Sequence, residues 1–385
     1  MKKNNYKEED LVVIAKRENN TKRTYLVVNK LQGKHIPVSP SKALAMFDTL
    51  ADILKNRYQN EKVLFVGFAE TATAIGARVA NTFGGIYIQT TREKIPDVDY
   101  LFFTESHSHA TEQKLVENDI KKWINEVDRI IFVEDEVTTG NTIKKIIDII
   151  KNKYPQNKNK NKIKFAVASL LNGMDDEALN KYKKEDIDLN YLVKTNHEKY
   201  IQIVSGISEN GEYIVDSVDI NNILNPDIIK IPGLINTRRA ADTKTYEVAC
   251  KNLAEKIWTI IQEQNELVQL NSKNILVLGT EECMYPAIFV GAFLEEKGFK
   301  VKTHSTTRSP IAASKDEGYP FEKRYQVCSF YDSQRVTFIY NLAKYDQVII
   351  VTDAEVTERN KGLNSLVNSL ETMGNQNIMC VNWIK

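Results

Sequence analysis

The stretch from Arg129 to Thr142 constrains this chain most, because it joins a buried strand pattern directly to the start of a helix. Its letters, RIIFVEDEVTTGNT, give an apolar run, then acidic residues, then a turn of hydroxyl residues and glycine. Isoleucines follow at helical spacing, at Ile143, Ile146, Ile147 and Ile150. A strand that leads straight into a helix is the repeating unit of an α/β fold with a parallel sheet.

The polar residues of this stretch suit a sugar phosphate. Glu134 and Asp135 lie where the predicted strand ends, so they can accept hydrogen bonds from ribose hydroxyls. The turn that follows offers N–H groups and hydroxyls to a phosphate at the helix N-terminus, where the helix dipole favours an anion. The residues of this turn are Thr138, Thr139, Gly140, Asn141 and Thr142. An ordinary capped turn explains the threonines but gives no reason for adjacent carboxylates.

A second strand-turn-helix pattern lies upstream, with a strand over 63–66 and a helix over 72–82. Its turn can hold another anion through Gly67, Ala69, Glu70, Thr71 and Thr73. A turn of small residues before a helix is common in α/β proteins, so this pattern gains its weight from its place in the chain.

The strand that comes next delivers two cations, Arg92 and Lys94. Arginine presents a planar fork to phosphate oxygens and lysine a movable charge, so the pair suits pyrophosphate. A solvated charged turn is the alternative.

The segment between Pro96 and Lys114 is polar and contains two histidines, His107 and His109. Their spacing suits one face of a strand rather than of a helix. A zinc site is disfavoured because no cysteine is near and the other histidines are distant in sequence. His107, together with Glu105, is a candidate for acid/base chemistry or phosphate contact, and a plain surface role is the alternative.

These motifs together resemble the phosphoribosyl-pyrophosphate (PRPP) signature of type I phosphoribosyltransferases. That signature is an apolar strand, two acidic residues, a short apolar pair, Thr-Thr-Gly and a hydroxyl residue. Glu136 departs from it, because the family carries an aliphatic residue there; this carboxylate could face solvent or assist a metal. The segment 105–112, the run VEDEVTTGNT and the run GFAETAT together narrow the resemblance to transferases of tellurite-resistance gene clusters. The tetrapeptide Thr307-Arg-Ser-Pro310 supports this, because it names the TRSP domain that follows the transferase domain in that family.

The resemblance implies a parallel sheet flanked by helices, with a small N-terminal hood that a hairpin over 24–38, turning near Gly33, would form. His35 and Ser39 would be candidates for base recognition there, with a plain loop or core role as the alternative for each. It also implies a pyrophosphate loop at 67–73, a lid at 105–112 that excludes water, and Mg²⁺ held through Glu134 and Asp135.

The implied activity is transfer of 5-phosphoribosyl from PRPP to a nitrogenous, base-like small molecule, with release of pyrophosphate. The product would belong to nucleotide-like biosynthesis linked to tellurite or stress resistance. A non-catalytic PRPP or nucleotide sensor on the same fold is the alternative. Members of the resembled family commonly dimerise, which makes a homodimer an expectation.

The two halves of the chain match each other in three places, in the same order. Residues 63–70 parallel 275–282, residues 88–95 parallel 304–311, and residues 130–139 parallel 348–357. We therefore expect a transferase domain over 1–222 and a related, degenerate α/β domain over 223–385. Glu358 replaces part of the phosphate turn and would repel a phosphate, which argues against a second PRPP site.

The second half still has polar residues at predicted strand ends, namely Thr307, Arg308, Ser309 and Asp353. These residues form a possible second site for a phosphate or a carboxylate, or they only cap the fold. Elsewhere in the chain, a hairpin is expected over 200–214, a linker over 225–233 and a long helix over 242–267.

Composition limits the partners. A net charge of +1 over 385 residues gives no basic footprint for nucleic acid. No apolar run reaches the roughly 18 residues that a membrane crossing needs, and the N-terminal residues are charged. The four cysteines have no paired spacing, which suggests a reducing compartment. We expect a cytoplasmic protein that binds neither nucleic acid nor membranes.

Overall fold

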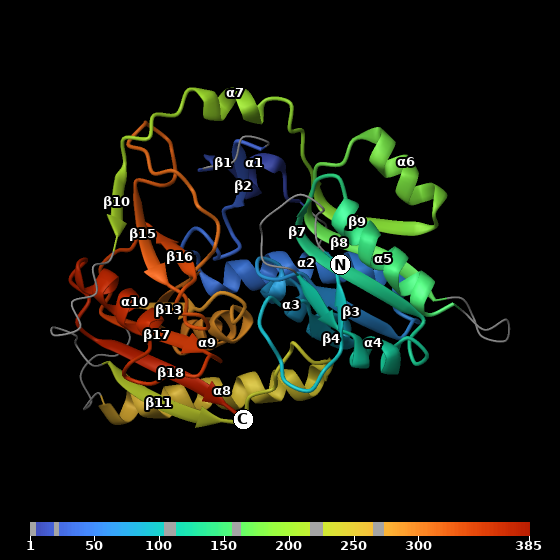
Figure 1. Ribbon diagram of the computed structural model, residues 1–385. Coiled ribbons are helices and arrows are strands. Elements are labelled where there is room, and N and C mark those ends of the chain that lie inside the picture. Colours follow the sequence, from blue (N-terminus) through green and yellow to red (C-terminus); the bar gives the residue numbers. More distant parts are fainter. Residues whose placement is uncertain (1–4, 19–22, 104–112, 156–162, 216–225, 265–272) are drawn as a thin grey trace. The chain divides into compact units, whose positions relative to one another are not determined.

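The computed structural model describes residues 5–18, 23–103, 113–155, 163–215, 226–264 and 273–385 (Figure 1). The chain forms two compact units. Unit 1 comprises residues 1–8, 45–196 and 235–247, and unit 2 comprises residues 9–44, 197–234 and 248–385.

A six-stranded sheet forms the centre of unit 1, in the order β12-β4-β3-β7-β8-β9. These strands are β12 (Ala241–Asp242), β4 (Ile86–Gln89), β3 (Val63–Gly67), β7 (Arg129–Val137), β8 (Lys164–Asn172) and β9 (Ile187–Lys194). Neighbours are parallel except β12, which runs antiparallel to β4. Continuous apolar runs make the central strands: every residue of β3 and β4 is buried.

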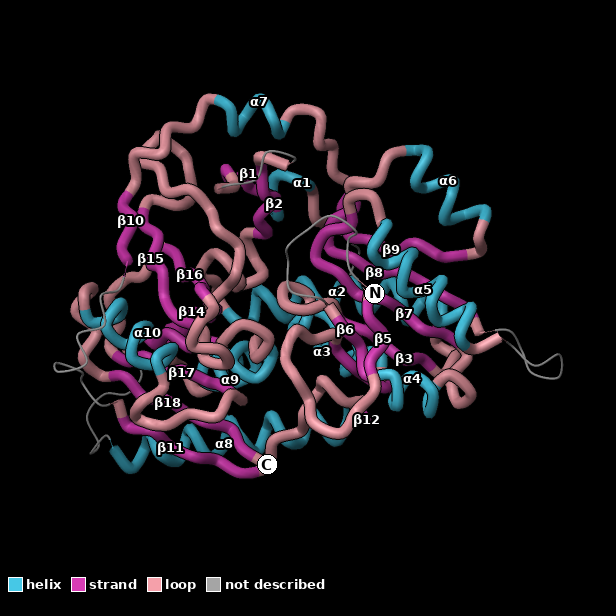
Figure 2. Tube along the Cα trace, viewed as in Figure 1, coloured by secondary structure: helices cyan, strands magenta, loops and turns pink. Residues whose placement is uncertain are grey.

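Helices connect these strands. They are α3 (Thr73–Phe83), α4 (Glu117–Trp123), α5 (Asn141–Lys153) and α6 (Asp176–Lys184), with α2 (Pro40–Tyr58) preceding them. Helix α3 packs against β3, β4 and β7, and Figure 2 shows it beside these strands. The four isoleucines of α5 are buried, as their spacing predicts. A short antiparallel hairpin, β5 (Tyr100–Phe102) and β6 (Lys114–Val116), lies between β4 and β7 in sequence.

Strand order fixes where a crevice can open in unit 1. The chain makes β3 first, places β4 on one side and then crosses to place β7 on the other. In open parallel sheets, ligands bind outside the carboxyl ends of the strands at such a reversal. Strand β3 stops at Gly67, opposite Val133, whereas β7 continues to Val137 along β8 alone. The last residues of β7 therefore border the end of β3 without a strand beside them on that side.

Unit 2 contains an all-parallel sheet in the order β11-β18-β17-β13-β14. Its strands are β11 (Asp227–Pro232), β18 (Ile378–Ile384), β17 (Gln347–Thr352), β13 (Asn274–Gly279) and β14 (Lys300–Ser305). Helices α9 (Tyr285–Glu296) and α10 (Lys361–Glu371) connect strands of this sheet, and α8 (Thr243–Gln264) runs from unit 1 into unit 2.

Smaller elements complete unit 2. A three-stranded sheet contains β10 (Glu212–Val215), β15 (Lys323–Cys328) and β16 (Val336–Tyr340). An N-terminal hairpin pairs β1 (Val12–Lys16) with β2 (Tyr25–Asn29) and follows the short helix α1 (Glu8–Leu11) in sequence. Another short helix, α7 (Tyr200–Ser205), comes much later in the chain, after β9. Two residues of this hairpin, Ala15 and Val28, share a core with Ile311, Phe321, Phe338 and Tyr340.

The predicted fold class is confirmed: both units are α/β, with parallel sheets and connecting helices. The long helix predicted over 242–267 is confirmed by α8 in its described part, and residues 265–267 lie outside the described residues. The predicted domain boundary near residue 222 stays a prediction, because compact units and sequence domains need not coincide. The segment predicted as a hood over the transferase site belongs to unit 2 in this division.

Three local predictions are wrong. The predicted hairpin over 24–38 is replaced by pairing of β2 with the upstream β1, and Gly33 lies in a turn after it. Residues 200–205 form α7 rather than a strand, and the predicted linker over 225–233 contains β11, which pairs with β18. Local pattern could not decide these short apolar segments, because β2 pairs with the strand before it rather than with the residues after it, and β11 pairs with β18 near the other end of the chain.

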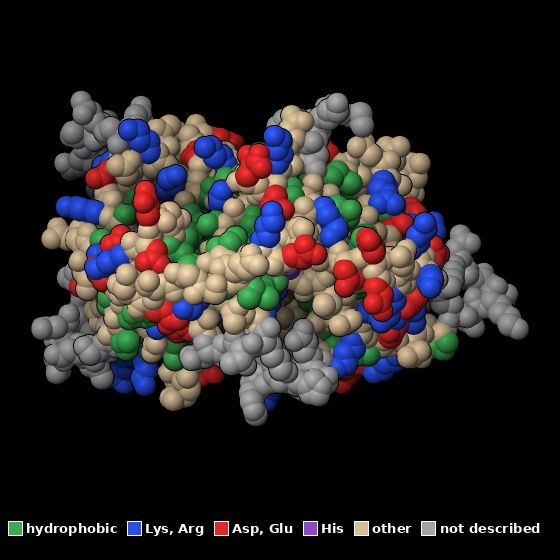
Figure 3. Space-filling view, turned by 90° about the horizontal axis from the view of Figure 1, so that it is seen from above, with side chains coloured by type: hydrophobic (Ala, Val, Ile, Leu, Met, Phe, Trp, Pro, Cys, Tyr) green, Lys and Arg blue, Asp and Glu red, His purple; other side chains and the backbone are tan. Residues whose placement is uncertain are grey.

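The surface carries both charges. On the face that Figure 3 shows, Lys and Arg side chains are interspersed with Asp and Glu side chains of the described residues. None of the described helices has both the length and the apolar character that crossing a membrane requires.

Candidate active site

The adjacent carboxylates lie on the part of β7 that extends past β3. Glu134 and Asp135 are both partly buried, and the Asp135 N–H donates to Glu134 Oε2 at 3.2 Å. Burial raises the pKa of Glu134 well above its usual range, and the neighbouring carboxylates of Asp135 and Glu136 raise it further. A cation or a set of hydroxyl donors would relieve this concentration of negative charge. Glu136 belongs to the same acidic group.

The turn 138–142 follows at once and opens α5. Gly140 has a left-handed backbone (φ 72°), and its carbonyl accepts the first helical hydrogen bond, from the Lys144 N–H at 2.9 Å. The Asn141 N–H donates to Thr139 Oγ1 at 3.3 Å. Thr138 and Thr142 are partly exposed, and Thr139 and Asn141 are exposed. The sequence-predicted phosphate residues are therefore gathered at one helix N-terminus.

A residue that no sequence motif marks supports this turn. Tyr182 of α6 is buried, and its hydroxyl donates to the Gly140 carbonyl at 2.6 Å. A Cβ added to Gly140 would lie 2.6 Å from the same hydroxyl, so the turn needs both the backbone freedom and the small size of glycine. Nothing in the local pattern marks Tyr182, because it is 42 positions from Gly140.

The turn 67–73 joins β3 to α3. The Ala69 N–H donates to Thr90 Oγ1 at 2.8 Å, and the Thr90 N–H donates to the Gly67 carbonyl at 2.9 Å. Thr73 begins α3, and its hydroxyl donates to the Glu70 carbonyl at 3.2 Å. Thr71 lies between them and is partly exposed.

Gly67 is confined by the next strand. A Cβ at Gly67 would lie 2.5 Å from the Tyr87 hydroxyl, which itself donates to the Thr73 carbonyl at 2.8 Å. Only glycine fits this close approach, which holds the turn 67–73 against β4.

The cations Arg92 and Lys94 follow the end of β4. Arg92 is partly buried and Lys94 is exposed. The neighbouring residue Thr91 exchanges backbone hydrogen bonds with Lys114, at 2.8 and 3.0 Å. Both predicted pyrophosphate cations therefore leave the sheet at the same edge as the turn 67–73.

The residues that flank the predicted lid meet the same region. The Gln113 side-chain N–H donates to the Ala69 carbonyl at 2.9 Å, and the Phe103 ring contacts the Phe68 ring edge-on at 5.7 Å. The candidates Glu105 and His107, like His109, lie outside the described residues.

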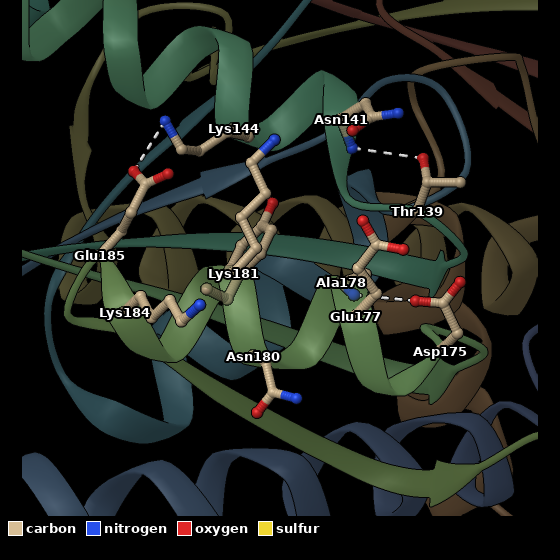
Figure 4. Close-up of a pocket in the computed structure, with 11 residues that line it drawn as sticks. Thr139, Asn141, Lys144, Asp175, Glu177, Ala178, Asn180, Lys181, Lys184 and Glu185 are labelled. Atoms are coloured by element: carbon tan, nitrogen blue, oxygen red, sulfur yellow. Dashed lines mark hydrogen bonds and ion pairs between the residues drawn. The ribbon is translucent and has the colours of Figure 1, made fainter.

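A cavity of about 850 Å³ lies between α5 and α6 (Figure 4). It touches the turn 138–142 through Thr139 and Asn141, and an ion pair between Lys144 and Glu185, at 2.8 Å, lies at its wall. Lysines and acids line it in similar number. Glu134 and Asp135 are not among its lining residues, so we place the candidate chemistry at the strand ends rather than in this cavity.

The carboxylates of Glu134, Asp135 and Glu136 are candidates for metal binding. Among the residues that the structure describes, no group of three or more His, Cys, Asp or Glu side chains is arranged to hold a metal ion by itself. Mg²⁺ commonly binds through one or two carboxylates and completes its shell with water and substrate phosphates. Glu134 and Asp135, next to the turn 138–142, fit that kind of site.

The possible second site is located in unit 2, where its members have partners within that unit. Arg308 Nε donates to Glu281 Oε2 at 3.2 Å, and Asp353 Oδ1 accepts from the Tyr331 hydroxyl at 2.5 Å. The Thr307 hydroxyl accepts from the Ser309 N–H at 3.2 Å, which closes a local turn.

Comparison with known proteins gives two family matches. Residues 11–198 match a family described as phosphoribosyl transferase, and residues 239–370 match the TRSP domain that lies C-terminal to it. No curated protein matches the chain.

Several solved structures resemble part of the chain. Adenine phosphoribosyltransferase from Thermoanaerobacter pseudethanolicus is 15% identical, covers 49% of this chain and 99% of its own, and has a TM-score of 0.34. The enzyme of the same name from Rhodothermus marinus is 12% identical, with 49% and 96% coverage and a TM-score of 0.32. A hypoxanthine phosphoribosyltransferase from Staphylococcus aureus is 15% identical, with 42% and 76% coverage and a TM-score of 0.26.

Proposed function

Since the chain belongs to the phosphoribosyl transferase family and carries a TRSP domain C-terminal to its transferase domain, we propose that it moves 5-phosphoribosyl from PRPP to a nitrogenous, base-like small molecule, releasing pyrophosphate. One observation supports the position of the site above all. At the reversal of strand order, β7 extends past β3 and presents Glu134 and Asp135 immediately before the glycine turn that opens α5.

In the proposed reaction, the bond from ribose C1 to the pyrophosphate oxygen breaks and a bond from C1 to an acceptor nitrogen forms. Positive charge develops at the sugar ring, as in other glycosyl transfers. Glu134 and Asp135 hold the ribose hydroxyls, and the turn 138–142 holds the 5-phosphate. Held at both ends, the sugar presents C1 to the acceptor in a fixed orientation.

The leaving group is taken by the opposite wall of the crevice. Arg92, Lys94 and the N–H groups of the turn 67–73 bind pyrophosphate as its charge grows. Each donor aimed at developing charge contributes on the order of 3 kcal/mol. Glu105 and His107 are proposed to accept the proton that the acceptor nitrogen releases or to contact phosphate. Mg²⁺, held through Glu134 and Asp135, would neutralise charge on the substrate phosphates.

The wider setting is proposed from the sequence resemblance alone. It comprises nucleotide-like biosynthesis, a link to tellurite or stress resistance, a homodimer and a cytoplasmic location.

The test is calorimetric binding of PRPP, with and without Mg²⁺, to the full chain and to two matched variants. Asp135→Asn should weaken magnesium-dependent binding on the order of 100-fold or more, because a charged acceptor of hydroxyl hydrogen bonds is lost. Asp353→Asn is the control: it changes the residue that sequence comparison aligns with Asp135, but in unit 2. It should bind PRPP like the wild type.

Equal losses in the two variants would contradict a single PRPP site in unit 1, and absence of binding by folded wild-type protein would refute the proposed substrate. Pyrophosphate release in a screen of nitrogenous bases then identifies the acceptor. PRPP binding without release for any base would favour the sensor alternative over transfer.

A further inference from the structure

The two units share a strand order, and their registers agree with the sequence match. In unit 1, Gly67 pairs with Gln89 on β4 and with Val133 on β7. In unit 2, Gly279 pairs with Ser305 on β14 and Val351 on β17. The three aligned pairs of segments, 63–70 with 275–282, 88–95 with 304–311 and 130–139 with 348–357, predict these same strand partners with no shift in register. The order β4-β3-β7-β8 thus recurs as β14-β13-β17-β18.

The turns at the strand ends repeat as well. In unit 1 the Ala69 N–H donates to Thr90 Oγ1 at 2.8 Å. In unit 2 the Glu281 N–H donates to Thr306 Oγ1 at 3.0 Å. The turn after β13 is therefore held by a hydrogen bond equivalent to the one that holds the turn after β3. At the position of Ala69, however, unit 2 carries a glutamate.

The repeat extends to a hairpin that sequence comparison did not align. In unit 1, Thr91 bonds to Lys114 of the hairpin β5–β6, and in unit 2, Thr307 bonds to Phe338 of the hairpin β15–β16. Both hairpins are antiparallel and precede the strand that follows the crossover. The tip of the second hairpin, residues 329–335, is called here the closing segment.

The closing segment bonds directly to Glu281, whose side chain is fully buried. Ser329 Oγ donates to Glu281 Oε1 at 2.5 Å, and Arg335 Nη1 donates to Oε2 at 3.1 Å. Arg308, the counterpart of Arg92, donates from Nε to the same oxygen at 3.2 Å. Two guanidinium groups and a hydroxyl thus surround one carboxylate, which is the donor set expected for a bound anion.

The same segment also covers the counterpart of the ribose-binding carboxylate. The Tyr331 hydroxyl donates to Asp353 Oδ1 at 2.5 Å and to the Thr280 carbonyl at 3.3 Å. A hydroxyl on Asp353 is the contact that a sugar would make at Asp135 in the proposed function. In unit 2 the chain supplies that hydroxyl itself.

Packing holds the closing segment in place. The Phe330 side chain belongs to the core of unit 2. The backbone carbonyl of Phe330 accepts a hydrogen bond from Asn360 Nδ2 at 3.1 Å. A Cβ added to Gly362, in the first turn of α10, would lie 2.6 Å from the Ser329 carbonyl. Backbone and helix are therefore in direct contact at the start of the segment.

We propose that Glu281 is an internal ligand of unit 2, whose carboxylate occupies an anion site formed by Arg308, Arg335 and Ser329. The class of ligand that this site would accept is a small carboxylate or phosphate anion. Because Glu281 and Tyr331 fill the two positions at which an anion and a sugar hydroxyl would bind, unit 2 is a copy of the transferase crevice closed by its own side chains. The proposal concerns unit 2 alone, so it can fail while the transferase proposal stands. The transferase proposal can likewise fail while this one stands.

Rescue of a Glu281 variant by acetate tests the internal-ligand proposal. Glu281→Ala removes a fragment of the size and charge of acetate and leaves the surrounding donors in place. The variant should lose about 5–15 °C in the midpoint of thermal unfolding of the full chain, because two partly buried guanidinium groups lose their shared anion. Sodium acetate, compared with sodium chloride at equal ionic strength, should recover part of that loss and leave the wild type unchanged.

Glu295→Ala is the matched control. The Glu295 carboxylate, in the same unit, accepts from Ser39 Oγ at 2.7 Å and from the Ser41 N–H at 2.8 Å, which are neutral donors. Acetate should not rescue this variant. If acetate raises the midpoint of Glu281→Ala no more than that of Glu295→Ala, the internal-ligand proposal is overturned.

A second pair of variants applies if Glu281→Ala does not fold. Glu281→Gln keeps the size of the side chain and removes only its charge. It should lower the midpoint by several degrees more than Glu295→Gln. Equal midpoints for the two glutamine variants would overturn the proposal without any rescue experiment.

Discussion

At the scale of single residues, Gly140 combines two requirements that glycine alone meets. Its backbone is left-handed, which costs other residues about 1 kcal/mol or more. Its missing side chain also leaves room for Tyr182, whose hydroxyl donates to the Gly140 carbonyl. The turn that is proposed to hold the 5-phosphate therefore depends on a side chain of α6 as well as on its own residues.

Gly140→Ala should lower the free energy of unfolding by about 2–4 kcal/mol, because backbone strain and a steric clash add. Gly84→Ala is the control, since Gly84 is also left-handed (φ 90°) but has nothing within 4 Å of an added Cβ. It should cost only about 1 kcal/mol. Urea unfolding measures both, and PRPP calorimetry should show weaker binding for Gly140→Ala alone. Equal costs would mean that Tyr182 moves aside freely.

At the scale of elements, ion pairs of Arg129 hold the amino end of β7 in place. Arg129 is buried and donates from Nε to Glu61 Oε2 at 2.6 Å and from Nη1 to Asp188 Oδ2 at 2.9 Å. Its guanidinium also lies 4.1 Å from the centre of the Tyr58 ring. This cluster joins α2, β7 and β9 at the edge of the sheet opposite the candidate site, so it serves stability rather than chemistry.

The cluster predicts acid sensitivity. Burial alone would raise the pKa of Glu61, but hydrogen bonds from Arg129 and Lys164 outweigh burial and hold that pKa below its ordinary value of 4.5. A carboxyl with a lowered folded pKa stabilises the protein above its unfolded pKa and loses this contribution as the pH falls through the folded pKa. The free energy of unfolding should therefore decline below about pH 4.5.

Glu61→Gln should lower that free energy by about 2 kcal/mol at neutral pH and flatten its decline in acid. Urea unfolding at a series of pH values is the measurement. Glu126→Gln, whose partner Lys62 lies 3.8 Å away on the surface, is the control and should cost less than about 1 kcal/mol. Parallel pH profiles for wild type and Glu61→Gln would show that the decline comes from other groups.

At the scale of the whole molecule, unit 2 draws on both ends of the chain. Lys34 is fully buried, and its Nζ donates to the carbonyls of Glu281 and Thr306 at 2.9 and 2.8 Å. The strand pair β1–β2 supplies core residues to the same unit. The family match for the transferase nonetheless begins at residue 11, so the N-terminal segment belongs to one domain by sequence and to the other unit by contacts.

A fragment of residues 223–385 should therefore fail to unfold cooperatively, because it lacks residues 9–44 and the partners of Glu281 and Thr306 that they provide. Circular dichroism during heating measures this. The control is the same fragment with residues 9–44 joined ahead of it by a flexible linker, which should recover a cooperative transition. Cooperative unfolding of 223–385 by itself would support the boundary near residue 222 as a folding boundary.

The α/β class, the two strand-turn-helix units and the internal match could all be predicted from the sequence, because buried strands, helical spacing and turn residues are local patterns. It also predicted Glu134, Asp135 and the turn 138–142 as neighbours, since they are contiguous in the chain. The residues that lie across from them became known only from the folded structure. Tyr182 on Gly140, Lys34 at Glu281 and the closing segment in unit 2 join residues far apart in sequence. Such contacts depend on how strands are ordered and helices packed, which no local spacing records.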